Sequence, residues 1–126
     1  MSSAKFQAVH PVLAVRDVPA AVRFYTEKLG FRLGFWDNPQ DPKYAGVVRD
    51  GVHVHLQWHD AGDFCGEGPE LRFVIDDPDS LFEEYRDKGV FHERTALRNT
   101  PWGTREFAFY DPDGNGLFFY RDLQAE

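Results

Sequence analysis

An internal repeat brings metal-binding residue types to equivalent positions of the chain. The first half contains His10 and His55, and the second half has Glu70 and Phe118 at offsets of 60 and 63 residues. Two imidazoles and one carboxylate can hold a divalent metal with open coordination positions, as in Lewis-acid and oxygen chemistry. Phe118 can neither bind a metal nor act as a base, so this set is incomplete. Without a metal, the two histidines are strand residues that face a ligand or a buried carboxylate.

Aromatic side chains at predicted strand ends and in loops indicate a second kind of site. The chain contains 12 Phe, 5 Tyr and 3 Trp, which together are 16% of its residues. A small core cannot easily bury all of these rings, so some are expected to line a pocket. Planar and cationic ligands stack on such rings, and a cation over Trp or Tyr gains about 0.5–2 kcal/mol. The candidates are Phe35, Trp36, Tyr44, Trp58 and Trp102.

Charge and composition exclude several classes of partner. The chain has 14 basic and 21 acidic residues, a net charge of −7. It therefore lacks the basic surface that nucleic acids or anionic membranes require, and its field favours cationic ligands. No secretory segment or apolar membrane span is evident, so we expect a cytoplasmic protein. No nucleotide-binding motif or activated nucleophile is recognisable, and the lone Cys65 excludes an internal disulfide.

The same repeat predicts the elements that position these side chains. Each half reads as strand, helix and three further strands, with module one at about 8–60 and module two at about 68–122. A four-stranded unit with one helix buries one sheet face and leaves the other to be covered. We therefore expect one α+β domain over residues 1–126, in which the two modules form a curved mixed-sheet trough that can hold a ligand.

Cap and turn residues support the predicted order of elements. Asp17 and Asp77 are suitable N-caps for the two helices. Asp50-Gly51 predicts the hairpin turn of the first module, and Asp113-Gly114 marks the corresponding turn of the second.

Further expectations concern single segments. Residues 8–15 and 90–97 are predicted to be strands, and residues 98–103 a loop. Glu106 alternates with Arg105 along its strand, which favours an exposed cross-strand ion pair over a place in the trough.

Short motifs follow one another along nearly the whole chain. They include Arg16-Asp17-Val18, Leu29-Gly30-Phe31, Ala45-Gly46-Val47-Val48-Arg49-Asp50, Pro101-Trp102-Gly103, Arg105-Glu106-Phe107-Ala108 and Asp111-Pro112. In this order they resemble the vicinal oxygen chelate superfamily, which includes glyoxalase I, extradiol dioxygenases and the bleomycin resistance proteins. The chain is most similar to the bleomycin resistance proteins.

This resemblance implies a strand-exchanged homodimer with the trough built between chains. Pro11 corresponds to the place where the first strand crosses to the partner, and a proline there is compatible with an edge or crossover. The resemblance also places Phe35, Tyr44, Gln57 and Trp102 in a drug-binding groove. Resistance proteins of this kind sequester large cationic drugs without breaking a bond.

Two functions follow from these observations. The leading one is non-catalytic binding and sequestration of a bleomycin-type cationic drug, with no cofactor. The alternative is a divalent-metal-dependent, glyoxalase-like lyase or dioxygenase that uses His10, His55 and Glu70, because the metal enzymes of the superfamily take ligands from these positions. Phe118 at the fourth position favours binding. The sequence does not separate the leading function from binding of another metabolite or antibiotic.

Overall fold

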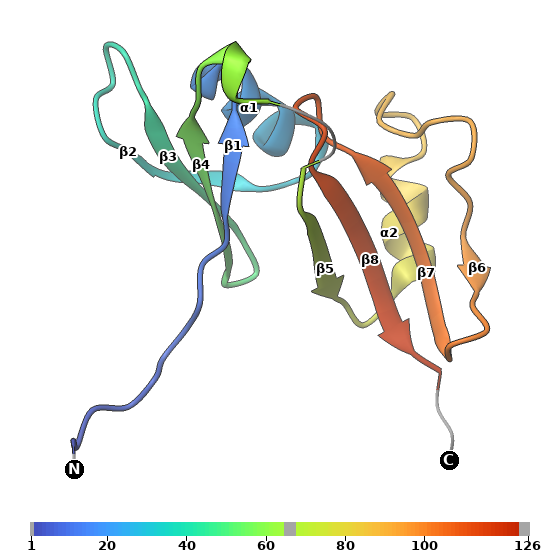
Figure 1. Ribbon diagram of the computed structural model, residues 1–126. Helices are drawn as coiled ribbons and strands as arrows, with labels where there is room; N and C mark the ends of the chain where they lie inside the picture. The colour runs from blue at the N-terminus through green and yellow to red at the C-terminus, as the bar shows by residue number, and fades with distance from the viewer. Residues whose placement is uncertain (1, 65–67, 124–126) are drawn as a thin grey trace.

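The computed structural model describes residues 2–64 and 68–123, so Cys65 lies outside the described residues (Figure 1). Two helical segments and two groups of strands alternate along the chain in the order that the repeat predicts. The elements are β1 (Val12–Val15), α1 (Val18–Arg23), η1 (Phe24–Lys28), β2 (Arg32–Trp36), β3 (Tyr44–Arg49), β4 (Val52–Trp58), η2 (Ala61–Asp63), β5 (Glu70–Val74), α2 (Pro78–Tyr85), β6 (Arg98–Asn99), β7 (Thr104–Tyr110) and β8 (Gly116–Asp122).

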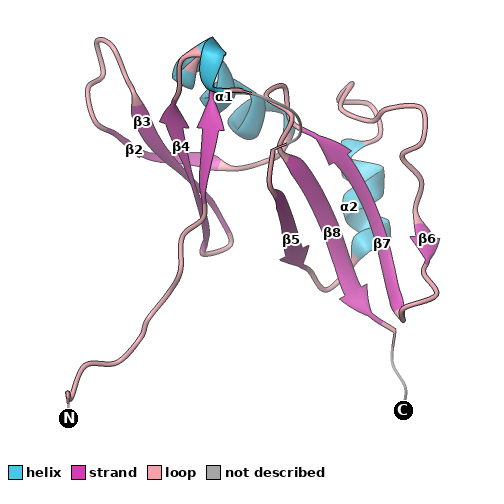
Figure 2. Ribbon diagram, viewed as in Figure 1, coloured by secondary structure: helices cyan, strands magenta, loops and turns pink. Residues whose placement is uncertain are grey.

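The strands form two mixed sheets of the same topology (Figure 2). Their strand orders are β1-β4-β3-β2 and β5-β8-β7-β6. In each sheet the first strand pairs in parallel with the last, and the remaining pairs are antiparallel. The predicted α+β architecture of tandem βαβββ modules is therefore confirmed.

The strand register reproduces the offsets of the repeat. Val12 pairs with His55 in the first sheet, and Arg72 pairs with Phe118 in the second. These two pairs differ by 60 residues in the first strand and 63 in the last, as the sequence predicts. The residues of the two modules therefore correspond one to one in this part of each sheet.

The helices begin where the capping residues predict. Asp17 Oδ1 accepts a hydrogen bond from the Ala20 amide at 3.0 Å, and Asp77 Oδ1 accepts one from the Ser80 amide at 3.0 Å. Each interaction satisfies one of the amides that a helix start leaves without an intrahelical partner. After α1 the helix continues as a π-helical turn, η1.

Of two predicted strands, the first is shorter in the structure and the second is absent. Residues 8–11 lie outside β1, and the segment predicted as a strand at 90–97 contains none. The short strand β6 (Arg98–Asn99) lies instead in the segment 98–103, which was predicted to be a loop. The Thr95 side chain explains the second difference. Its hydroxyl donates to the Ala108 carbonyl at 2.9 Å and accepts from the His92 amide at 3.1 Å, so a side chain binds where a strand backbone was predicted.

A continuous core lies between each helix and the sheet that it covers. The helices contact the central strands β3, β4, β7 and β8. The fully buried large side chains are Tyr25, Tyr85, Phe107, Phe109, Leu13, Leu29, Leu56 and Leu117. Because side chains alternate across a strand, the intervening residues face the other side of each sheet. We call these surfaces the first open face, on β1–β4, and the second open face, on β5–β8.

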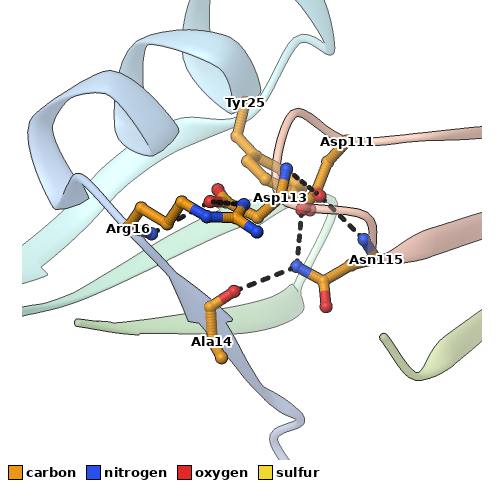
Figure 3. A network of polar contacts seen from close by, with 6 residues as sticks. All are labelled: Ala14, Arg16, Tyr25, Asp111, Asp113 and Asn115. Atoms are coloured by element: carbon orange, nitrogen blue, oxygen red, sulfur yellow. Dashed lines mark hydrogen bonds and ion pairs between the residues drawn. The ribbon is translucent and has the colours of Figure 1, made fainter. Parts of the chain in front are cut away.

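Reciprocal contacts join the modules. The Tyr25 hydroxyl donates to Asp111 Oδ2 at 2.9 Å, and the Asn115 amide group donates to the Ala14 carbonyl at 3.2 Å. Figure 3 shows this network, in which Arg16 also pairs with Asp113. Residues of β1, of the segment after β1 and of η1 in module one thus bind the β7–β8 turn of module two.

A second contact between the modules uses Tyr85, the residue of module two that is equivalent to Tyr25. Tyr85, 60 residues after Tyr25, donates its hydroxyl proton to the Leu29 carbonyl at 2.7 Å. Arg49, beside the β3–β4 turn, forms a two-pronged ion pair with Glu84 at 2.9 Å for each contact. The pseudo-twofold relation therefore extends from the sheets to the contacts between modules.

Candidate ligand-binding site

Three rings form a contiguous patch on the first open face. Phe35 stacks on Tyr44 with ring centroids 6.2 Å apart, and it meets His55 edge-on at 5.4 Å. Tyr44 and His55 also meet edge-on at 5.4 Å. Phe35 is 45% exposed, so a large part of an aromatic surface is available to a planar ligand.

Strand pairing explains why these rings meet. Gly46 pairs with Phe35 on one side and with His55 on the other. A Cβ at Gly46 would overlap the Phe35 ring, so the ring occupies the space directly over this glycine. Glycine at the centre of β3 therefore provides the space in which the patch forms.

A cluster of histidines borders the patch. His10 stacks on His53 with centroids 4.7 Å apart and lies 5.0 Å from His55. His55 Nδ1 is 2.8 Å from the Tyr44 hydroxyl. Burial lowers the pKa of His55, and the neighbouring His10 and His53 lower it further. His55 therefore favours the neutral form and can both donate and accept hydrogen bonds.

The predicted metal ligands are divided between the modules. His10 and His55 lie together at the first open face, whereas Glu70 begins β5 in the second sheet, where it pairs with Gly116. Within residues 2–64 and 68–123, no three His, Cys, Asp or Glu side chains are arranged to hold a metal ion. The structure thus does not bring His10, His55 and Glu70 into one metal site within a single chain.

The predicted ligand-binding residues fall on different surfaces. Phe35, Tyr44 and Gln57 share the first open face. Trp36 packs against the core on the helix side of the sheet. Trp58 pairs with the fully buried Val15, which also places it on the helix side, and Lys43 covers its ring at 4.7 Å.

Trp102 belongs to the other module. It lies in the turn before β7, is 59% exposed and has the Arg98 guanidinium over its ring at 5.4 Å. No single surface of the chain therefore gathers all six predicted residues, and Trp102 is separated from the Phe35 patch by the division into sheets.

The second open face contains an ion pair whose exposure was predicted wrongly from the sequence. Glu106 was expected in an exposed ion pair, but it is only 2% exposed. Its Oε1 accepts from Arg72 Nη2 at 3.1 Å and from the Thr104 hydroxyl at 2.7 Å. Arg72 reaches over β8 and lies 4.3 Å from the Tyr120 ring centroid and 5.4 Å from that of Phe118.

Arg72 was not identified from the sequence, although the repeat contained a signal for it. The offset of 60 aligns it with Val12, which also faces the open side of its sheet. A charged residue at such a position, with a glutamate on the same face two strands away, indicates a functional pair. Neither residue stands out in a linear motif.

A cleft of about 830 Å³ lies between the modules. Apolar side chains of β5 and α2, including Leu71, Phe73 and Leu81, line it together with Ala8 to Pro11 and the β3–β4 hairpin. In the described part of the chain, no helix is long and apolar enough to cross a membrane.

The chain thus consists of two βαβββ modules in a pseudo-symmetric arrangement, each with an open face of aromatic and polar side chains. The sequence agrees: residues 7–119 match the profile of the Glyoxalase/Bleomycin resistance protein/Dioxygenase superfamily. The chain belongs to this superfamily.

Relatives with more specific descriptions cover almost the whole chain. A bleomycin-binding protein from bleomycin-producing Streptomyces verticillus, crystallised with copper(II)-bleomycin, is 31% identical; the match covers 98% of this chain and 99% of that one, with a TM-score of 0.76. A bleomycin resistance protein of Geobacillus stearothermophilus is 26% identical, over 91% of this chain and 96% of its own length. A superfamily member from Nocardioides, 21% identical, shares the fold with a TM-score of 0.78 over 99% of this chain and 89% of its own.

Proposed function

We propose that the protein binds a bleomycin-type drug, planar and cationic, and confers resistance by sequestering it in the cytoplasm. The observation that carries this proposal is the exposed patch of Phe35, Tyr44 and His55 on a fold whose 31%-identical relative was crystallised with copper(II)-bleomycin. Flat rings stack on this patch, and the net charge of −7 attracts a cationic ligand. Binding of this kind requires no bond to be broken.

The proposed groove has two walls, supplied by two copies of the chain. The first open face of one protomer forms one wall, with Phe35, Tyr44 and Gln57. The second open face of its partner forms the other, with Trp102. This arrangement accounts for the separation of the predicted residues within one chain, and a twofold dimer would contain two such grooves.

The N-terminal segment supports the dimer. The chain before residue 8 extends away from the body of the molecule (Figure 1), Phe6 is fully exposed and Val9 is 88% exposed. Large apolar side chains of a soluble monomer are seldom left so completely in water. We propose that this arm crosses at Pro11 and packs in the cleft between the modules of the partner, which the apolar residues of β5 and α2 line.

Light scattering coupled to size-exclusion chromatography tests the dimer. We expect a mass of twice the 14.5 kDa chain for the wild type. The double variant Phe6→Ser with Val9→Ser is expected to be monomeric, whereas Lys5→Ser with Gln7→Ser, in the same arm, stays dimeric. A wild-type mass of one chain would contradict the proposal.

Calorimetric titration with metal-free bleomycin and with copper(II)-bleomycin tests the function. We expect saturable binding with a dissociation constant of micromolar or lower, and none with a neutral drug of similar size. Phe35→Ala should weaken binding about tenfold or more, because it removes the most exposed ring of the patch. Trp58→Ala, on the other side of the same sheet, is the matched control and should change it less than about twofold. Absence of saturable binding to the wild type would overturn the proposed function.

A further inference from the structure

The second open face contains a charged pair on an otherwise largely aromatic surface. Arg72 extends from β5 across β8 to Glu106 on β7, and its guanidinium lies 4.3 Å from the centroid of Tyr120. Thr104 donates to Glu106 at 2.7 Å, and the Thr104 and Thr100 hydroxyls are 2.7 Å apart. Four side chains are thus joined in one polar network.

The two members of the pair differ in their access to solvent. Glu106 is 2% exposed, whereas the side chain of Arg72 is 39% exposed. Among residues 2–64 and 68–123, Arg72 forms its protein hydrogen bond through Nη2 alone. The guanidinium therefore keeps Nε and Nη1 as donors for a ligand.

Stability alone does not account for this pair. Removing a carboxylate from water is costly, and an apolar side chain of similar volume at position 106 would avoid that cost. What the network provides is orientation: the buried carboxylate fixes one edge of the guanidinium, and the Tyr120 ring fixes its plane. The remaining edge is presented to a ligand in a defined direction.

We propose that Arg72 is a specificity-determining residue that hydrogen-bonds an acceptor oxygen, a carboxylate or a carboxamide carbonyl, attached to a planar ring of the ligand. The ring packs beside Tyr120 and Phe118, and the oxygen meets the free edge of the guanidinium, which suits planar acceptors. Glu106 acts as a positioning residue through Arg72. This inference rests on the proposed function, because it assigns the ligand chemistry at the second wall of the same groove.

Three probes that share one ring test this chemistry: 2-naphthoate, 2-naphthamide and 2-naphthylmethylamine. Binding to the wild-type protein is followed by NMR chemical-shift titration. We expect naphthoate to bind most tightly and the amine most weakly, with a difference of about fivefold or more between them, as a charge-assisted hydrogen bond provides. Equal affinities, or tightest binding of the amine, would overturn the inference.

Variants locate the preference at Arg72. In Arg72→Gln naphthoate should no longer bind more tightly than the amine, whereas Arg23→Gln, which removes the same charge from the exposed surface of α1, should keep the wild-type order. Glu106→Gln, which keeps Arg72 but loosens it, should reduce the preference without reversing it. Retention of the full preference in Arg72→Gln would contradict the assignment.

A second variant covers the case in which Arg72→Gln unfolds because Glu106 is left without its partner. The double variant Arg72→Gln with Glu106→Gln removes both charges, and it is expected to fold and to lack the preference.

Bleomycin titration separates the two proposals. Bleomycin binding without a carboxylate preference refutes the role of Arg72 alone, whereas a carboxylate preference without bleomycin binding refutes only the proposed drug.

Discussion

Gly46 controls the shape of the first open face at the scale of a single residue. The Phe35 ring lies over it, and a Cβ there would overlap the ring. We expect Gly46→Ala to turn the half-exposed ring outward, with a change in the free energy of unfolding below about 1 kcal/mol. Bleomycin affinity should fall about fivefold, since an aromatic contact is worth about 1 kcal/mol.

Thermal unfolding and calorimetric titration of the same samples separate these two effects. Gly62→Ala is the control, because a Cβ there meets nothing within 4 Å. If Gly46→Ala binds bleomycin as the wild type does, the position of the Phe35 ring is irrelevant to the ligand.

Glu106 makes stability depend on pH. Burial raises its pKa, but hydrogen bonds from Thr104 and Arg72 outweigh that effect, so the pKa falls below its ordinary 4.5. A carboxylate with a lowered folded-state pKa stabilises the fold above its unfolded-state pKa, and this contribution is lost as the pH falls through the folded-state pKa. We expect Glu106→Gln to reduce the free energy of unfolding by about 1.5–3 kcal/mol near neutral pH and by progressively less in acid.

Urea denaturation at about pH 7 and about pH 3 measures this difference. The exposed Glu93→Gln is the matched control and should leave the free energy of unfolding within about 0.5 kcal/mol of the wild type at both pH values. A penalty for Glu106→Gln that stays constant between the two pH values would show that its charge does not matter.

Residue types alone predicted the open faces only in part. The sequence identified Phe35 and Tyr44, but it assigned Trp36 and Trp58 to the same pocket although alternation along β2 and β4 directs them to the helix side. A β-bulge between Leu33 and Phe35 shifts the register of β2, and this shift is not visible in the residue types. The burial of Glu106 was missed because its partner, Arg72, lies two strands away.

Local signals predicted the elements better than the site. The Asp17 and Asp77 caps and the β3–β4 hairpin lie where the sequence indicated, because each depends on a few adjacent residues. The prediction of a strand at 90–97 was wrong because this segment depends on a contact with a residue distant in the sequence. Its apolar residues Phe91 and Leu97 do pack on the core, but the Thr95 hydroxyl replaces the strand pairing.

The two caps offer a test at the scale of the element. Asp17→Ala and Asp77→Ala each remove a side-chain acceptor from a helix start, and each should lower the free energy of unfolding by about 1 kcal/mol. Asp17→Asn and Asp77→Asn keep an acceptor and should recover most of this loss. Urea denaturation measures all four, and no recovery in the asparagine variants would show that the caps act through charge instead of hydrogen bonding.

The whole molecule keeps the symmetry of its repeat while its two open faces diverge. Registers, caps and inter-module tyrosines are equivalent in the two modules. The open faces differ: Tyr44 and Gly46 of module one correspond in β-pairing to Glu106 and Ala108 of module two. A dimer that opposes the two faces would therefore combine an aromatic wall with a wall that adds the Arg72–Glu106 pair to its rings, which is suitable for a ligand with unlike ends.

Tyr25 and Tyr85 occupy equivalent positions, and substitutions at them show whether the two modules also contribute equally to the free energy of unfolding. Both are buried, and burial raises the pKa of each, so both hydroxyls stay protonated and donate. Tyr25 donates to the Asp111 carboxylate, whereas Tyr85 donates to the Leu29 carbonyl, which also accepts from Arg49 at 2.8 Å.

Phenylalanine substitutions should therefore have unequal costs. Tyr25→Phe removes a hydrogen bond to a charged acceptor and should lower the free energy of unfolding by about 1.5–3 kcal/mol. Tyr85→Phe leaves the Leu29 carbonyl with its Arg49 partner and should cost about 0.5–1.5 kcal/mol. The residues share no partner, so the double variant should show the sum within about 0.5 kcal/mol. Urea denaturation of the four proteins checks this, and a larger cost for Tyr85→Phe would mean that the β3–β4 side of the interface holds the modules together.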